Sequence, residues 1–332
     1  MLPKRFAARV LLGVACGLAI GLALGMSQTG RSLPPDTSDR SFVPVSPPAT
    51  SLPTPYAPED EGTLVGAGDI AGCAWVEDDA TADLLDSIPG VVFTLGDNVY
   101  PGGSAGRFRE CFGPTWGRHR DRIRPVLGTR DDFSTGAAEY FIYFGAAAGE
   151  RDRGYYAYDV GNWRVYAMNS VCELAGGCGP GSEQYEWLAA DLIERPSQCT
   201  LGYWHHPPSA ARPGSTSGDT PAGVDPLFEL LHEANAEIVL AAGAHNYQRF
   251  APLAPDGNPD PAGGVRLFIV GTGGAPLDRL SMRLPPTVEA SSDEVHGVLK
   301  LALEDGTYDW EFVSTTGDFS DDGSGTCRPP TG

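Results

Sequence analysis

The 332-residue chain carries 23 Lys and Arg against 43 Asp and Glu, a formal net charge of −20. This acidity excludes a grip on the nucleic-acid backbone as the main activity and disfavours binding of the folded part to anionic membranes. An anionic ligand such as phosphate would need a local cationic site. With 41% hydrophobic residues the chain can form one sizeable core, while 43 Gly and 29 Pro fit poorly with a helical bundle.

Residues 1–26 have the layout of a secretory signal peptide. Three basic residues (Lys4, Arg5 and Arg9) precede an uncharged apolar run over residues 10–26, and Ala23-Leu24-Gly25 offers a small-x-small site for cleavage. The run is also just long enough to span a bilayer if it is not cleaved. A signal peptide and an N-terminal membrane anchor both stay open. In either case we expect the rest of the chain to be exported, outside the cell or at its surface.

Six cysteines follow this segment: Cys73, Cys111, Cys172, Cys178, Cys199 and Cys327. An even number is typical of disulfides formed in an oxidising compartment. Cys172 and Cys178 flank a Gly-rich loop and are the favoured local pair, and Cys73–Cys111 and Cys199–Cys327 would then remain. Sequence alone allows about fifteen pairings. A zinc cluster is the alternative, and the absence of a C-x-x-C motif argues against it.

Two further regions follow from composition and periodicity. Residues 27–60 are rich in Pro, Ser and Thr, which predicts a flexible stalk. Residues 61–328 alternate short apolar runs with helical patterns, and this predicts one α/β domain with mixed sheets. In chain order we expect a strand at 63–67, a helix at 78–88, strands at 91–95, 124–127, 155–160 and 163–168, a helix at 183–193, a strand at 200–204, a helix at 226–234, strands at 237–241 and 266–270, and a hairpin of 298–303 with 308–313.

Polar residues follow five of the predicted strands. They are Asp69, the pair Asp97-Asn98, the run Thr129-Arg130-Asp131, the pair His205-His206, and His245. Asp or Asn after a strand is often only a turn or a helix cap. However, ligands bind at the carboxyl ends of strands in open α/β sheets. A series with acids first and histidines last therefore predicts a metal site.

Five segments carry a family resemblance: Gly68-Asp69, Gly96-Asp97-Asn98-Val99-Tyr100, Gly128-Thr129-Arg130-Asp131, His205-His206-Pro207 and Gly243-Ala244-His245-Asn246-Tyr247-Gln248-Arg249. In order and spacing they resemble the motif blocks of the calcineurin-like metallophosphoesterases, in particular the secreted purple-acid-phosphatase-like branch. The resemblance covers nearly the whole of residues 61–328. It implies a four-layer sandwich of two mixed β-sheets flanked by helices. It also implies two metal ions, bridged by a carboxylate, that activate a water for phosphoester hydrolysis.

The resemblance assigns the metal ligands residue by residue. Asp69, Asp97, Tyr100 and His245 would hold the first metal, and Asp97 would bridge to a second metal that His205 also binds. Carboxylate, phenolate and imidazole ligands suit Fe, Mn or Zn.

Three residues are the candidate catalytic set: Asn98, Arg130 and His206. Asn98 would either cap a helix or contact substrate. His206 fits a supporting or surface role better than that of a ligand.

Two blocks depart from the family pattern. The third block has Thr129 and Arg130 where the family has Asn and His, and Gly243 stands where the fifth block has its first His. The second metal therefore keeps only Asp97 and His205, unless a neighbour moves in (Asp131, Asp132 or His206). The first metal loses no recognisable ligand.

The Arg130 side chain could supply the positive charge that a second metal would otherwise provide at its site. We expect its guanidinium to point into that site and bind phosphate oxygens with a fixed positive charge. The group is a poor general acid, because its pKa is above about 12. The alternative is a surface Arg130 paired with Asp131 or Asp132.

Two functions remain open. The first is an exported metal-dependent phosphoesterase that slowly hydrolyses phosphate mono- or diesters. The second is an impaired pseudoenzyme that binds one metal and a phosphate-like anion or a surface partner. In both, a phosphoester or phosphate is the expected ligand, nucleic acid is not, and the membrane is contacted only through the possible N-terminal anchor.

Overall fold

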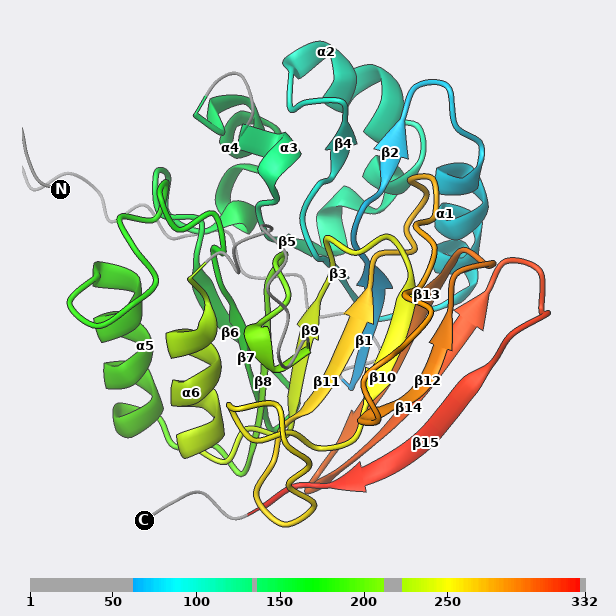
Figure 1. Cartoon of the computed structure of the whole chain (residues 1–332). Helices are drawn as coiled ribbons and strands as arrows, with labels where there is room; N and C mark the ends of the chain where they lie inside the picture. The colour runs from blue at the N-terminus through cyan, green and yellow to red at the C-terminus, as the bar shows by residue number, and fades with distance from the viewer. Residues whose placement is uncertain (1–61, 133–135, 212–222, 329–332) are drawn as a thin grey trace, which may run out of the picture. The chain divides into compact units, whose positions relative to one another are not determined.

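The computed structural model describes residues 62–132, 136–211 and 223–328 (Figure 1). They belong to one compact unit, Thr54–Gly332. The predicted signal or anchor, residues 1–26, and the predicted stalk, residues 27–60, lie outside the described residues. Within the described ranges, none of the helices combines the length and the apolarity that crossing a membrane requires.

A six-stranded sheet contains the first strands of the chain and the last. Its strands, in spatial order, are β15 (Asp321–Thr326), β14 (Thr307–Ser314), β13 (Gly297–Glu304), β1 (Thr63–Ala67), β3 (Val91–Thr94) and β5 (Ile123–Pro125). β1, β3 and β5 run parallel, whereas β13, β14 and β15 form an antiparallel ribbon joined to β1. The sheet is therefore mixed, and its parallel half comes from the motif-bearing N-terminal segment.

A seven-stranded sheet contains the middle of the chain. Its order is β12 (Val288–Ser292), β10 (Tyr247–Phe250), β11 (Arg266–Val270), β9 (Ile238–Ala241), β8 (Cys199–Tyr203), β7 (Trp163–Ala167) and β6 (Tyr156–Val160). β7, β8, β9 and β11 are parallel, and β6, β10 and β12 are antiparallel to their neighbours. The two-residue strands β2 (Ala71–Gly72) and β4 (Val99–Tyr100) pair separately.

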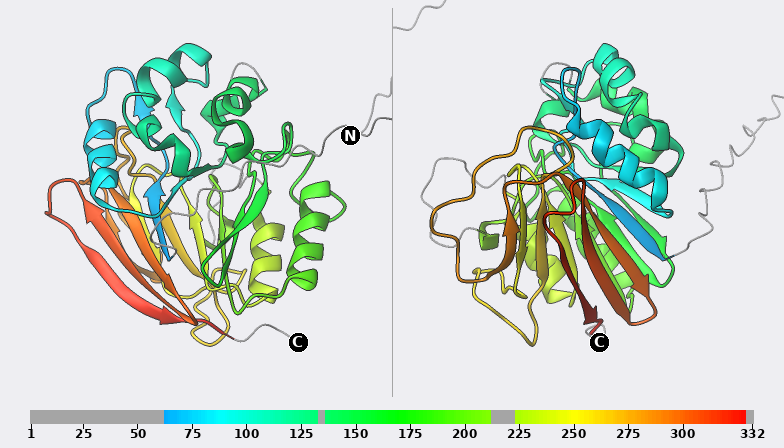
Figure 2. Two further views of the ribbon diagram at one scale, coloured as in Figure 1. Left: turned by 180° about the vertical axis from the view of Figure 1, so that it is seen from behind. Right: turned by 90° about the vertical axis from the view of Figure 1, so that its right-hand side faces the viewer.

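Side chains alternate between the two faces of the seven-stranded sheet. Leu240 and Val270 belong to the core that also contains the six-stranded sheet. Val239 and Ile269 belong to a second core, together with residues of α5 (Glu183–Glu194) and α6 (Asp225–Glu233). On the other side of the sandwich, α1 (Glu77–Ser87) packs against β13 and the 3₁₀ helix η2 (Trp116–Arg122) against β3 (Figure 2). The predicted four-layer α/β sandwich is confirmed.

Short helices complete the connections between strands. They are α2 (Ala105–Arg107), the π-helix η1 (Phe108–Phe112), α3 (Thr129–Asp132), α4 (Ala138–Phe144), η3 (Gly145–Ala148) and η4 (Ser209–Ala211). Figure 1 shows α2, α3 and α4 at one end of the sandwich, beyond the strand ends that carry the motif residues.

The predicted elements are present within one or two residues of their expected bounds, and the hairpin of β13 and β14 is confirmed. Two polar segments have buried side chains. Asp321 lies in the edge strand β15 and is buried where it accepts hydrogen bonds from Tyr247 and Arg249. His119 lies in η2, which buries its imidazole.

The described residues contain three disulfides: Cys73–Cys111, Cys172–Cys178 and Cys199–Cys327. Cys172–Cys178 is the local pair that the sequence favoured, and the other two disulfides are the pairs that then remained. Cys199–Cys327 attaches the end of the edge strand β15 to the start of β8.

Candidate metal centre

The parallel strands of both sheets end in loops that are bonded to one another. The Gly68 amide donates to the Val270 carbonyl (2.8 Å), and the Ile70 amide donates to the Asp97 carbonyl (3.0 Å). The Ala242 amide likewise donates to the His205 carbonyl (2.8 Å). The loops after β1, β3, β8 and β9 are thereby held side by side, and each contributes side chains to one cluster.

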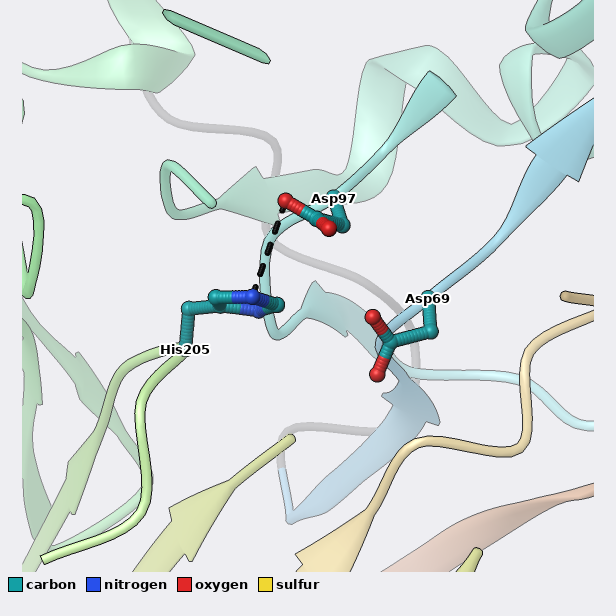
Figure 3. A group of neighbouring side chains, drawn as sticks. All are labelled: Asp69, Asp97 and His205. Carbon is teal, nitrogen blue, oxygen red and sulfur yellow. Dashed lines mark ion pairs between the residues drawn. The ribbon is translucent and has the colours of Figure 1, made fainter. Parts of the chain in front are cut away.

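Asp69, Asp97 and His205 form the centre of this cluster. All three are buried, and their candidate ligand atoms lie within 4.8 Å of one another (Figure 3). His205 Nε2 lies 3.6 Å from Asp97 Oδ1, and its Nδ1 lies 2.8 Å from the Leu95 carbonyl oxygen. Because a carbonyl only accepts, Nδ1 donates to it. Burial disfavours the charged form of His205, but the charges of Asp97 and Asp69 raise its pKa above the ordinary value. In the neutral form of the ring the Nε2 lone pair faces the cluster, as in metal-ligating histidines.

Tyr100 and His245 complete the cluster from β4 and the loop after β9. The Tyr100 hydroxyl oxygen lies 2.7 Å from Asp69 Oδ1, 2.9 Å from Asp97 Oδ2 and 3.1 Å from His245 Nε2. His245 Nδ1 lies 3.0 Å from the Pro276 carbonyl oxygen and so donates to it. One hydroxyl proton cannot serve three acceptors at once. Convergent oxygen and nitrogen donors of this kind fit a transition-metal ion.

The buried carboxylates of the cluster favour a compensating positive charge between them. Burial raises the pKa of Asp97. Burial also opposes ionisation of Asp69, but the hydrogen bond with His245 and the charge of His205 bring the pKa of Asp69 below its ordinary value. Burial disfavours the charged form of His245, yet its hydrogen bond with Asp69 raises the pKa of His245 to about 9. Protons supply this charge in the metal-free protein, and a bound cation would supply it otherwise.

Asn98 and Asp131 lie next to the cluster and are hydrogen-bonded to each other. The Asn98 amide group is fully buried and donates to the Val126 carbonyl (3.0 Å) and to Asp131 Oδ2 (2.9 Å). Asp131 also accepts from the backbone N–H groups of Asn98 and Gly128. Burial and the nearby Asp97 raise the pKa of Asp131 to about 7. Asp131 thus holds the loops together and is not one of the three clustered candidate ligands. The Asp132 side chain lies outside the described part of the chain.

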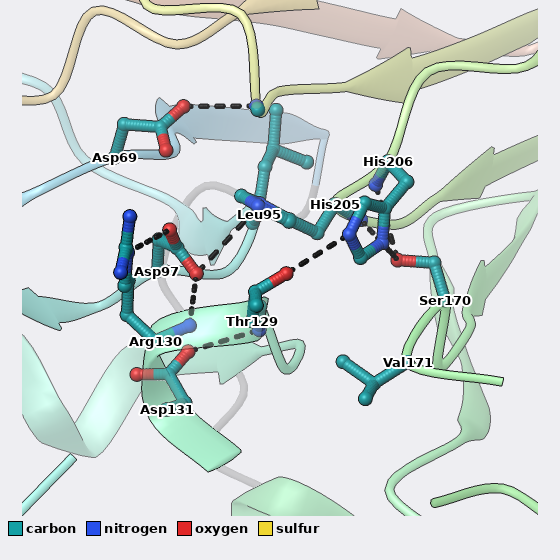
Figure 4. A network of polar contacts seen from close by, with 12 residues as sticks. Asp69, Leu95, Asp97, Thr129, Arg130, Asp131, Ser170, Val171, His205 and His206 are labelled. Atoms are coloured by element: carbon teal, nitrogen blue, oxygen red, sulfur yellow. Dashed lines mark hydrogen bonds and ion pairs between the residues drawn. The ribbon is translucent and has the colours of Figure 1, made fainter. Parts of the chain in front are cut away.

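Arg130 lies beside the predicted bridging carboxylate. Its backbone N–H donates to Asp97 Oδ1 (2.7 Å), and its Nε lies 4.0 Å from Asp97 Oδ2, with 45% of the side chain exposed (Figure 4). The guanidinium carbon is 5.9 Å from the centre of the Tyr100 ring. This ion pair with Asp97 differs from the surface alternative, in which Arg130 pairs with Asp131 or Asp132.

His206 lies next to the cluster without joining it. Its ring centre is 4.8 Å from that of His205, its Nε2 is 3.0 Å from Thr129 Oγ1, and its Nδ1 is 2.9 Å from Ser170 Oγ. Burial and the charge of His205 lower the pKa of His206 to about 3, so the ring is neutral at physiological pH. Sequence reasoning missed Ser170, which follows β7 in no recognisable motif.

Gly243 marks the place of the missing histidine. It has a positive φ of 73°, and its N–H donates to Asp69 Oδ2 (2.9 Å). A Cβ atom built at Gly243 would lie 3.4 Å from His205 Nε2. A side chain at this position would project toward His205, so glycine removes one potential donor from the side of the cluster where a second metal is expected.

The comparisons with known proteins agree with this architecture. No family model matches the sequence. Purple acid phosphatase 21 of Arabidopsis thaliana is 30% identical over 122 residues, which are 36% of this chain and 26% of that protein. The chain therefore matches about a quarter of the length of this curated relative.

Solved structures extend the likeness over most of the chain. Purple acid phosphatase PPD1 from yellow lupin (Lupinus luteus) seeds has a TM-score of 0.64 at 17% identity, covering 79% of this chain and 53% of its own. GAP50, the anchor in the inner membrane complex of Plasmodium, has a TM-score of 0.55 at 12% identity, with 80% and 88% covered. PhoD has a TM-score of 0.52 at 12% identity, with 79% and 69% covered. The chain thus has the metallophosphoesterase fold and is similar to the purple acid phosphatases in both sequence and structure.

Proposed function

We propose that this chain is an exported metal-dependent phosphoesterase that slowly hydrolyses phosphate mono- or diesters. The observation that carries the proposal is the convergence of oxygen and nitrogen donors at the strand ends of a purple-acid-phosphatase-like fold. Asp69, Asp97, Tyr100 and His245 would hold one Fe, Mn or Zn ion tightly. Asp97 and His205 would hold a second ion weakly. When bound, the metal supplies Lewis acidity and activates a water.

The other side chains would bind and orient the ligand. Arg130, which is 45% exposed beside Asp97, would hold phosphate oxygens. His206 is neutral and would act through its hydrogen bond to Thr129. Asn98 is buried and its Nδ2 donates to Val126 and Asp131, while among the described residues its Oδ1 has no hydrogen-bond partner. We propose that Asn98 supports the loops through Nδ2.

The proposed organisation places this site outside the cell. Residues 1–26 would act as a signal peptide or anchor, residues 27–60 as a stalk and residues 61–328 as the catalytic domain. Three disulfides among the described residues support an oxidising compartment.

A second candidate function is a pseudoenzyme that binds one metal and a phosphate-like anion or a surface partner. Thr129 and Gly243, which replace two expected ligands of the second metal, favour the pseudoenzyme. GAP50, which shares the fold, is named as an anchor, and by analogy a fold of this type would serve this chain as a binding module.

Metal stoichiometry and turnover, measured together, test the proposal. The full chain, Asp97→Asn and the exposed control Asp309→Asn are compared by mass spectrometry for bound metal and by hydrolysis of a phosphoester. Two metals per chain, with turnover lost only in Asp97→Asn, would support the phosphoesterase. One metal without turnover would support the pseudoenzyme. No bound metal would overturn both.

A further inference from the structure

Ser170 makes an unusual set of contacts behind the candidate metal centre. Its side chain is buried, and its Oγ accepts hydrogen bonds from the backbone N–H groups of His205 (3.2 Å) and His206 (3.1 Å). The same Oγ lies 2.9 Å from His206 Nδ1 (Figure 4). Three groups therefore surround one hydroxyl.

These contacts determine where the protons lie. A hydroxyl has two lone pairs and one proton, and here two N–H donors occupy the lone pairs. The Ser170 proton is left to donate to His206 Nδ1, so the ring is neutral and carries its proton on Nε2. Nε2 then donates to Thr129 Oγ1, which is 3.0 Å away. The Thr129 proton remains available to a third group.

Thr129 is exposed and lies between His206 and Asp97 in Figure 4. Its chain neighbour Arg130 is tied to the Asp97 carboxylate through its backbone N–H. The hydroxyl thus lies at the rim of the cluster, and the Arg130 guanidinium lies on the other side of the Asp97 carboxylate (Figure 4). An outward-facing hydroxyl donor and a fixed cation together suit an acceptor-only, tetrahedral oxyanion.

We propose that Ser170 is a positioning residue that holds His206 in its Nε2–H tautomer, and thereby directs the Thr129 hydroxyl to donate to a phosphoryl oxygen. The identity of this ligand rests on the proposed function. At a position where the resembling family has a metal ligand, this chain has a hydrogen-bond donor to the substrate. The chain Ser170, His206, Thr129 binds the oxyanion and transfers no proton.

The tautomer gives a test that needs no substrate. The full chain is labelled with ¹⁵N-histidine, and His206→Gln identifies the His206 signals. We expect an unprotonated Nδ1 and a protonated Nε2 in the unsubstituted protein. Ser170→Ala should lose this preference, whereas the exposed control Ser87→Ala should keep it. A protonated Nδ1 in the unsubstituted protein, or an unchanged tautomer in Ser170→Ala, would overturn the inference.

Phosphate binding tests the second step. Calorimetric titration of the metal-loaded full chain with inorganic phosphate should show Kd raised about tenfold in Thr129→Val and in Ser170→Ala, because a hydrogen bond to a charged ligand is lost. Thr129→Ser keeps the hydroxyl and should stay within about twofold. Thr307→Val, at an exposed position of β14, should match the unsubstituted chain.

The two proposals fail in different ways. A Thr129→Val protein with unchanged Kd would refute the role of this hydroxyl while leaving the phosphoesterase intact. An unsubstituted chain that binds metal but no phosphate would overturn the ligand assigned here together with the proposed function.

Discussion

The Tyr100 hydroxyl oxygen lies 2.7 Å from Oδ1 of the fully buried Asp69. Asp69 lies in the loop between β1 and β2, and Tyr100 lies in β4; the pairing of β2 with β4 brings the two segments together. The same oxygen is within hydrogen-bond distance of Asp97 and His245. Charged and polar groups are thus buried together in one place. Their burial costs desolvation free energy unless a cation compensates their charge.

Metal binding should stabilise the folded protein. A ligand that binds only the native state at about 100 times its Kd adds about 2.7 kcal/mol to the free energy of unfolding. We expect Mn²⁺ or Zn²⁺ to raise the melting temperature of the full chain, and a chelator to reverse the gain. Calorimetry of the metal-free and metal-loaded chain checks this. Asp97→Asn should lose the gain and Asp309→Asn should keep it. An equal gain in both variants would place the metal elsewhere.

Arg130→Ala should weaken phosphate binding by about tenfold, since the variant loses a charge-assisted contact. The Kd of inorganic phosphate, measured by titration calorimetry at constant metal content, reports the change. Arg130→Lys keeps the charge without the planar fork and should fall between the two. Arg109→Ala is the control, because that side chain is 71% exposed and pairs with Glu110. Phosphate binding that is unchanged in Arg130→Ala would remove Arg130 from the proposed site.

Asp78 should make stability depend on pH. Its side chain is 2% exposed, and within the described residues its Oδ1 has no hydrogen-bond partner. Burial raises the pKa of Asp78 to about 6. Between its unfolded value of about 3.9 and this value, the native state binds more protons than the unfolded state. The pH-dependent contribution of Asp78 to the free energy of unfolding is therefore complete below about pH 4 and is lost as pH rises through about 6.

Asp78→Asn tests this dependence. The variant should exceed the unsubstituted chain in unfolding free energy by up to about 3 kcal/mol at pH 8, and by little at pH 4. Denaturant unfolding at both pH values measures the difference. Asp79→Asn, an exposed change in the same helical turn, separates the effect from the charge of the helix end. A difference that is the same at both pH values would contradict the assignment.

Sequence patterns predicted the strands that carry the cluster, because each is a short apolar run that ends in a polar motif. The edge strand β15 carries no such signal. Its sequence is polar, and main-chain bonds to β14 and the burial of Asp321 against Arg249 make it a strand. The contacts of Ser170 and Asp131 are equally invisible, because they depend on how loops distant in sequence meet. The resemblance left Asn98 open as a helix cap or a substrate contact, and nothing in the sequence indicates that its Nδ2 donates to Val126 and Asp131.

Gly128 allows the second and third motif loops to touch, and its replacement should dismantle the cluster. A Cβ atom at this position would overlap the backbone nitrogen and Oδ1 of Asp97. Gly128→Ala must therefore displace the carboxylate that also faces His205. We expect a loss of about 1–3 kcal/mol in stability from the overpacking and, beyond that, a loss of bound metal.

Gly106→Ala is the matched control, because a Cβ atom on that α2 residue meets nothing within 4 Å. Its stability should change by less than about 1 kcal/mol, and its metal content should stay the same. Metal analysis and denaturant unfolding of both variants distinguish a displaced ligand from a general effect of adding a methyl group. If Gly128→Ala retained full metal content, Asp97 could not be a ligand in its present position. The metal would then have to bind through the other donors alone.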